Sequence, residues 1–337
     1  MPGLPNSHFQ THLQSHRLSL ENIREAARVI DPVFLHSPQF SCEPLGAILN
    51  CDVTLKVETL NPIRSFKGRG ADYFVRKLSE RGAVPGLVCA SAGNFGQALA
   101  YACRRRKISL VVYAARNANA LKVERMRGLG AEVRLDGSDF DDAKSIARSW
   151  AASAGMALVE DGREAEISEG AGTIAVELLA RTSALDAIVV PLGNGALLTG
   201  MARWTKAEAP STRVIGVVSA GATSMQASWQ RGPGGGIVTH PRTDTIADGI
   251  AVREPIAEAV ADMYGLVDDV VAVDDAAIIR AMRLLHEHAG VVVEPAGAAG
   301  LAAITGQFAG QRVATVLCGG NLTPAQMSAW LAAKTSN

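Results

Sequence analysis

The stretch Ser65-Phe66-Lys67-Gly68-Arg69-Gly70 places a lysine where a strand gives way to a helix. The preceding run, residues 53–58, alternates apolar and polar side chains, which is typical of a strand. Asn61-Pro62 interrupts that strand, and a helical pattern follows it. We therefore expect Lys67 on the first turn of a helix, followed by Gly68 and Gly70, which let a backbone or a flat ring approach closely.

Such a lysine is expected to be poorly solvated and to have few carboxylate partners. Desolvation lowers the pKa of a lysine and makes its amine nucleophilic. An enzyme that binds a carbonyl compound as a Schiff base needs an amine of this kind. For the hexapeptide alone, an ordinary surface lysine on a helix remains the alternative.

The composition excludes several classes of partner. The 337 residues include 33 Lys plus Arg and 33 Asp plus Glu, so the formal net charge is zero, which argues against nucleic acid or an anionic membrane as partner. No apolar run approaches the roughly 20 residues of a membrane span. The five cysteines form no CxxC pair and read as free thiols in a reducing compartment, so we expect a cytoplasmic protein.

Short strand patterns alternate with helical patterns along most of the chain. Strands are predicted at 53–58, 87–90, 108–113, 131–135, 156–160, 187–192, 214–219, 270–273 and 313–317. Helices are predicted at 20–30, 94–106, 119–129, 139–153, 170–181, 275–289 and 297–309. This alternation predicts an α/β fold with parallel sheets covered on both faces, and so many strands favour two sheets. Chemistry is then expected in the loops that follow strands.

Three of these loops are rich in small and hydrogen-bonding residues. The run Ser91-Ala92-Gly93-Asn94-Phe95-Gly96-Gln97 opens a helix and suits an anionic group, with a capped helix as the alternative. Residues 191–200 (PLGNGALLTG) lack the P-loop and GxGxxG signatures but can bind phosphate through backbone N–H groups, and a turn without a ligand is the alternative. Cys318-Gly319-Gly320-Asn321 presents a neutral thiol after the last strand, although an isolated cysteine is most often only a small buried residue.

In this order, the loops resemble those of the fold-type II pyridoxal-phosphate enzymes, most closely the threonine/serine dehydratase and serine racemase branch. The segments that carry the resemblance are 36–38, 65–70, 91–97, 122, 130–133, 170–173, 191–200, 245–252, 294–298 and 318–321. The resemblance implies a tryptophan synthase β-like fold with two domains and the cofactor in the cleft between them. Residues 1–60 and 160–337 would form the large domain, and residues 61–159 a small mobile domain.

The resemblance also implies roles for individual residues. Lys67 would carry the aldehyde of pyridoxal 5'-phosphate as a Schiff base and then act as general base at Cα. Phe66 would support the ring, Asn94 would bond its 3-oxygen, and Cys318 would stand at the pyridine nitrogen. The cofactor phosphate would be bound by Gly193, Asn194, Gly195, Ala196 and Leu197, and the substrate carboxylate by Ser91, Ala92, Asn94 and Gln97.

The implied reaction is α,β-elimination from a β-hydroxy-α-amino acid, threonine or serine by default, to a 2-oxo acid and ammonia. Ala92 stands where the family's racemases carry a serine that acts as acid and base. Because alanine cannot carry a proton, racemisation is less expected than dehydration. Residues 217–220 lack the glutamate of the racemase metal site, so no metal is expected. A homodimer is the family expectation.

Other reactions of the family stay open. They include racemisation, the dehydration of 3-hydroxyaspartate or an arylserine, and the β-replacement reaction of threonine synthases. The last stays open because Glu169, directly before residues 170–173, resembles the pattern of threonine synthases more than that of dehydratases. A catalytically silent binding protein is a further alternative.

Two residues depart from the family pattern, Phe95 and Arg64. Arg64 could bind an acidic side chain of the substrate, but we favour the interpretation that it is an ordinary surface arginine. His8, His12 and His16 could share a helix face, and a solvated arm is favoured there over a metal site.

Overall fold

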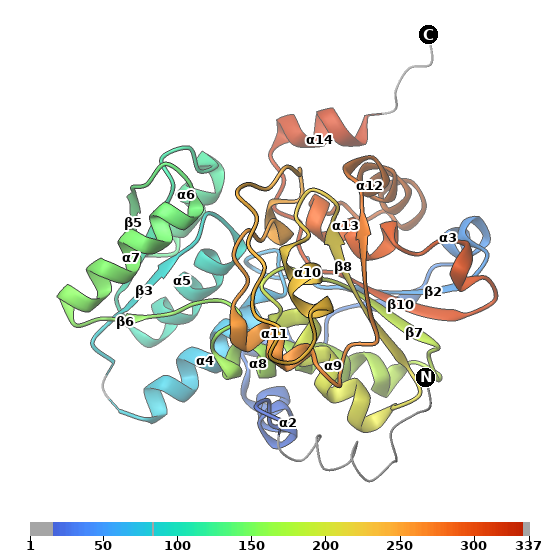
Figure 1. Cartoon of the computed structure of the whole chain (residues 1–337), viewed down its shortest axis with the longest axis horizontal. Coiled ribbons are helices and arrows are strands. Elements are labelled where there is room, and N and C mark those ends of the chain that lie inside the picture. The colour runs from blue at the N-terminus through green and yellow to red at the C-terminus, as the bar shows by residue number, and fades with distance from the viewer. Residues whose placement is uncertain (1–15, 83, 333–337) are drawn as a thin grey trace.

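The computed structural model describes residues 16–82 and 84–332, which form two β-sheets covered by helices (Figure 1). The six-stranded sheet has the order β1-β2-β10-β7-β8-β9, and the four-stranded sheet the order β5-β4-β3-β6. The strands are β1 (Gln39–Ser41), β2 (Asp52–Val57), β3 (Leu87–Ala90), β4 (Leu110–Ala114), β5 (Glu132–Leu135), β6 (Ala157–Leu158), β7 (Ala187–Pro191), β8 (Arg213–Ser219), β9 (Asp269–Val273) and β10 (Arg312–Leu317). Neighbouring strands are parallel except β1 and β2.

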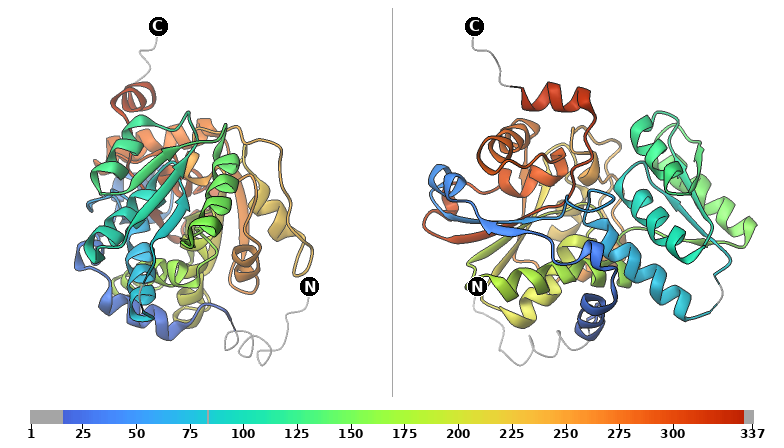
Figure 2. Two further views of the ribbon diagram at one scale, coloured as in Figure 1. Left: turned by 90° about the vertical axis from the view of Figure 1, so that its left-hand side faces the viewer. Right: turned by 180° about the vertical axis from the view of Figure 1, so that it is seen from behind.

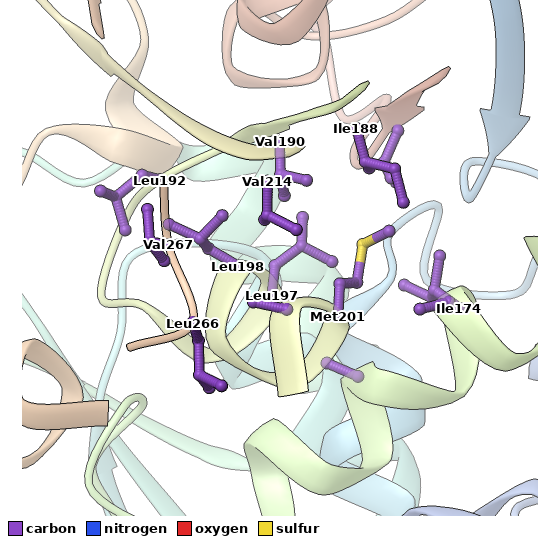
Figure 3. Packing of buried hydrophobic residues seen from close by; sticks show 14 of the residues in the cluster. Ile174, Ile188, Val190, Leu192, Leu197, Leu198, Met201, Val214, Leu266 and Val267 are labelled. Atoms are coloured by element: carbon purple, nitrogen blue, oxygen red, sulfur yellow. The ribbon is translucent and has the colours of Figure 1, made fainter. Parts of the chain in front are cut away.

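The predicted α/β class, the two sheets and each predicted strand are confirmed. The edge strand β1 was not predicted, because it has only three residues and none of them is buried. In the six-stranded sheet, successive side chains of β7 point to opposite faces. Ile188 accordingly packs with Ile174 and Met201 on one face (Figure 3), whereas Val189 packs with Ile278 on the other. The near-continuous apolar strands are therefore buried on both sides.

The helices lie on both faces of the two sheets (Figure 2). They are α2 (Leu20–Val29), α3 (Glu43–Leu49), α4 (Lys67–Glu80), α5 (Asn94–Arg106), α6 (Ala120–Gly128), α7 (Phe140–Ala154), α8 (Ala165–Arg181), α9 (Ala196–Glu208), α10 (Ser224–Gln230), α11 (Ala257–Met263), α12 (Asp275–Ala289), α13 (Pro295–Ala302) and α14 (Pro324–Leu331). Short 3-10 turns occur at Pro32–Phe34, Asp248–Ile250 and Gly306–Phe308. Within the described residues no helix is long and apolar enough to cross a bilayer.

Two predicted helices have different bounds in the structure. Helix α8 begins at Ala165 rather than at residue 170, because tertiary contacts satisfy polar residues in its first turns. Among these, Glu169 is buried and accepts hydrogen bonds from the backbone N–H of Ser19 and from the Asn22 amide. Helix α13 ends at Ala302, and the extended conformation of Thr305 separates it from the 3-10 turn that follows.

A buried ionic cluster fixes the first turn of α4. The fully buried guanidinium of Arg69 donates to the Glu58 carboxylate at 2.9 and 2.8 Å and to the Glu177 carboxylate at 2.7 and 2.9 Å. The Lys56 ammonium donates to Glu177 at 2.6 Å. Two cations therefore balance two carboxylates, and the cluster joins β2 and α8 to α4 two residues after Lys67.

The N-terminal histidines are only partly described. His8 and His12 lie outside the described residues. His16 is half-buried, its Nε2 lies 3.1 Å from the backbone oxygen of Asp262, and burial lowers its pKa. The expectation of a solvated arm is therefore wrong for His16, because this residue packs against α11.

Candidate active site

A cavity of about 560 Å³ lies where the carboxyl ends of β3, β7 and β10 meet the start of α4. The predicted site residues that line it are Phe66, Lys67, Ser91, Ala92, Asn94, Asn194 and Cys318. Gln97 does not line it: this side chain is 1% exposed and lies within α5. Of the predicted phosphate turn only Asn194 reaches the wall, while Gly193, Gly195, Ala196 and Leu197 lie behind it.

Lys67 is the first residue of α4, as predicted, and its side chain is 14% exposed. Its Nζ lies 4.6 Å from the centroid of the Phe66 ring. The same Nζ donates to Oδ2 of Asp161 at 2.5 Å. The expectation that Lys67 has few carboxylate partners is therefore wrong. Asp161 lies 94 residues further along the chain, in the loop after β6, and no local pattern reveals that contact.

The loop before α5 is held from both ends. The Ser91 hydroxyl accepts hydrogen bonds from the backbone N–H groups of Gly93 and Gly96 at 3.2 and 2.9 Å, so it caps the loop. Its proton has no acceptor within residues 16–82 and 84–332 and can donate into the cavity that Ser91 lines. The Asn94 amide donates to Glu294 at 2.6 Å and accepts from Asn321 at 2.8 Å. Both contacts fix the direction in which Asn94 faces the cavity.

The turn before α9 has the properties of an anion site. Gly195 has φ of +97°, a left-handed conformation that favours glycine. Among the described residues, none of the hydrogen bonds uses a backbone N–H group from 193 to 198 as donor. The side chains of Leu197 and Leu198 point into the core (Figure 3), while their N–H groups form the positive end of a 13-residue helix. A phosphate group fits these unpaired donors.

Cys318 lines the cavity next to Phe66, whose backbone N–H donates to the Cys318 backbone oxygen at 3.0 Å. Its thiol is buried and donates to the backbone oxygen of Ala296 at 3.5 Å. Burial raises the pKa of this thiol, so it stays neutral. Gly249 approaches the same region, and a Cβ there would lie 2.9 Å from the Ala296 methyl group. The segment at Gly249 therefore packs closely against the start of α13, and a side chain at 249 would not fit there.

Glu294 is a site residue to which the sequence analysis gave no role. It lines the cavity, is 2% exposed, and accepts from the Asn94 amide and from the Asn321 backbone N–H. Burial raises the pKa of its carboxyl group to about 7, although Lys122 and these hydrogen bonds oppose the shift. A glutamate at the end of the apolar run 291–293 was the available signal, because such a residue needs buried partners.

Ion pairs join the two sides of the cavity mouth. Lys122 on α6 pairs with Asp248, and Arg253 pairs with Asp139 and Asp141 at the start of α7. These contacts connect helices that pack on the four-stranded sheet to the segment 242–256. The pairing residues are far apart in sequence, so the sequence analysis did not find them.

Arg64, Phe95 and Glu169, three of the residues that depart from the dehydratase pattern, have distinct positions. Arg64 is exposed and does not line the cavity, as favoured from the sequence. Phe95 is 7% exposed and lines the wall. Glu169 binds the start of α2 and not the cavity. Among residues 16–82 and 84–332, no cluster of three or more His, Cys, Asp or Glu side chains could hold a metal ion.

Comparisons with known proteins agree with this geometry. A family model described as pyridoxal-phosphate dependent enzyme matches residues 30–319. An L-threonine ammonia-lyase of Thermotoga maritima is 35% identical over 307 residues, which cover 90% of this chain and 76% of the relative. A serine racemase of Oryza sativa subsp. indica is 34% identical over 285 residues, covering 84% and 83%.

Solved structures give the same result. Maize serine racemase superposes with a TM-score of 0.86 at 30% identity over 92% of this chain and 95% of that chain. The processed form of a threonine deaminase from Solanum lycopersicum superposes with a TM-score of 0.85 at 27% identity over 97% and 93%. The chain therefore belongs to the family of pyridoxal-phosphate dependent enzymes, in the fold-type II branch that contains threonine ammonia-lyases and serine racemases.

Proposed function

We propose that this enzyme is an ammonia-lyase that converts a β-hydroxy-α-amino acid, serine or threonine by default, into a 2-oxo acid and ammonia. One observation carries the proposal. The Lys67 amine and the phosphate turn at Asn194 face one cavity, and Ala92 supplies no hydroxyl group there. The threonine ammonia-lyase and threonine deaminase relatives support the same reaction class.

The residues present fit pyridoxal phosphate. The unpaired N–H groups from Gly193 to Leu197 would hold its phosphate behind Asn194, which lines the cavity, and Lys67 would hold its aldehyde. Phe66 would support the ring, Asn94 would bond its 3-oxygen, and Cys318 would face its pyridine nitrogen. When bound, the cofactor withdraws electrons from the Cα of an amino acid attached to it and so acidifies the Cα proton.

The chain's own groups then account for elimination. The Ser91 hydroxyl and the start of α5 hold the substrate carboxylate beside Asn94 and Ala92, and Gln97 supports this loop from behind. The freed Lys67 amine takes the Cα proton, and the β-hydroxyl group leaves as water with a proton for which the cofactor phosphate at the turn before α9 would be the nearest source. Because the Cys318 thiol is neutral, it does not hold a positive charge on the ring nitrogen as a carboxylate would, which favours departure of the β-group over return of the proton.

Two alternatives find less support in this site. Racemisation needs a second acid/base group at Cα, and Ala92 cannot carry a proton. Glu169 does not support β-replacement, because its carboxylate accepts hydrogen bonds from Ser19 and Asn22 and does not face the cavity.

A substrate panel tests the proposal. The purified enzyme with added pyridoxal phosphate is incubated with L- and D-serine, both threonine diastereomers, 3-hydroxyaspartate and phenylserine, and both 2-oxo acid and ammonia are measured. The proposal expects equal amounts of the two products from serine or threonine. If no amino acid in the panel yields a 2-oxo acid, the proposal is refuted.

We also propose an oligomeric state, a cellular location and domain boundaries for this enzyme. We expect a homodimer in the cytoplasm, with a large domain from residues 1–60 and 160–337 and a small domain from residues 61–159. Five free cysteines support a reducing compartment. Sedimentation equilibrium tests the dimer.

A further inference from the structure

Asp161 is a charged residue in the cavity wall, beside the reactive lysine. Its side chain is 10% exposed. Its Oδ2 accepts from Lys67 Nζ at 2.5 Å and, more weakly, from the Asn194 amide at 3.5 Å. Its Oδ1 is buried and has no hydrogen-bond partner among the described residues. One oxygen of a carboxylate that lines the cavity therefore lacks a donor.

The other carboxylates around the cavity differ from Asp161 in their partners. Each of them except Glu254 has a hydrogen-bonding or ionic partner that the proposed reaction leaves unchanged. The pairs are Asp248 with Lys122, Asp139 and Asp141 with Arg253, Glu160 with Lys144, and Glu294 with the amide of Asn94. Glu254 is exposed. Asp161, by contrast, depends on the amine that reacts. Lys67 changes its bonding during the reaction, and its contact is with Oδ2 alone, so the buried Oδ1 still needs a donor, because an unsatisfied buried acceptor is costly.

A bound amino acid can supply that donor from its β-carbon. To lose its proton to Lys67, the Cα must lie roughly 3–3.5 Å from Nζ. The β-substituent is two bonds further on, and Asp161 Oδ2 is 2.5 Å from the same Nζ. A hydroxyl or ammonium group on the β-carbon is thus within hydrogen-bonding reach of Asp161, whereas a halide, an ester or a phosphate there would meet only an acceptor.

We propose that Asp161 determines specificity by accepting a hydrogen bond from the β-substituent, so that the site selects amino acids with a donor at the β-carbon. This inference rests on the proposed function, because it takes Lys67 as the reactive amine. It narrows the substrate class to β-hydroxy and β-amino amino acids, and it excludes O-acyl, O-phospho and β-halo amino acids as preferred substrates.

Binding of two unreactive ligands tests the inference without relying on turnover. The compounds α-methylserine and 2-aminoisobutyrate both lack a Cα proton and differ only in the β-hydroxyl group. Their dissociation constants are measured for the holoenzyme by the change in cofactor absorbance. The wild type is expected to bind α-methylserine about tenfold or more tightly, as a hydrogen bond to a charged acceptor would give. In Asp161→Asn, which keeps the size but removes the charge, the ratio should fall to within about threefold of unity.

Glu254→Gln is the matched control, because it removes the same charge from the cavity wall at an exposed position. The control should keep the wild-type ratio. Equal binding of the two ligands by the wild type overturns the inference even if the Asp161 variant does not fold, and so does an unchanged ratio in a folded Asp161→Asn. If serine still yields a 2-oxo acid in either case, the proposed function stands and only the role of Asp161 is lost.

Discussion

Removal of the Arg69 guanidinium should destabilise the enzyme far more than removal of any exposed arginine on the same helix. Arg69→Met keeps most of the volume and the apolar stem, but it removes hydrogen bonds to Glu58, Glu177 and Thr173. Glu58 then has no hydrogen-bonded cation, and Glu177 keeps only Lys56 as an ion-pair partner. The variant therefore buries an uncompensated carboxylate beside the site.

The size of the effect follows from burial. The side chains of Arg69 and Glu58 are 0% exposed, and that of Glu177 is 9% exposed. Burial alone would raise the pKa of Glu177, but Arg69 and Lys56 hold it at about 2. Breaking a buried ion pair by removing one partner costs about 3–5 kcal/mol of unfolding free energy. We expect this loss for Arg69→Met at pH 7.

Urea unfolding followed by circular dichroism measures the loss. Arg76→Met is the matched control, because Arg76 lies on α4 and forms an exposed pair with Glu80, which is expected to contribute less than about 1 kcal/mol. Adding Glu58→Gln to Arg69→Met should recover part of the loss, since the orphaned charge is removed. A loss below about 1 kcal/mol for Arg69→Met, or a double variant as unstable as the sum of its parts, would show that the cluster does not stabilise α4 as argued.

Three further substitutions probe the site. The native pKa of Glu294, about 7, lies above its ordinary 4.5, so the contribution of this carboxyl group to stability falls as pH rises between these values. In urea unfolding from pH 4.5 to 7.5, Glu294→Gln should therefore remove up to about 3 kcal/mol of the decline in unfolding free energy. An unchanged dependence on pH would exclude a buried neutral carboxyl group. Ala92→Ser should increase conversion of L- to D-serine about tenfold or more, measured by chiral chromatography, and no gain would mean that Ala92 does not limit racemisation. Gly195→Ala should weaken pyridoxal phosphate binding about tenfold in equilibrium dialysis, because φ is +97° and the new Cβ would lie 2.9 Å from that of Ala259, whereas Gly234→Ala, equally left-handed but with open space around it, should not.

The periodicity of the sequence was sufficient to predict the sheets and most helices. Strands such as β7 are buried on both faces and are therefore apolar throughout, and helices such as α5 and α12 begin and end where their patterns change. The start of α8 was missed because Ser168 and Glu169 are polar, and their burial depends on partners distant in the sequence.

The candidate site was predictable only in part for the same reason. Lys67, Asn94 and Cys318 belong to loops with recognisable composition, and the structure brings them to one cavity. Asp161 and Glu294 act through contacts with Lys67 and Asn94, and these depend on how the two sheets pack together. A residue whose role arises from tertiary pairing leaves little local signal in the chain.

The covalent attachment of the cofactor is the most direct measurement. The purified enzyme is saturated with pyridoxal phosphate, reduced with borohydride, digested and analysed by peptide mass spectrometry. The account predicts one modified peptide with the reduced cofactor on Lys67, and loss of both the modification and the cofactor absorbance in Lys67→Ala. An unmodified Lys67, or a modification that persists on another lysine in the variant, would contradict it.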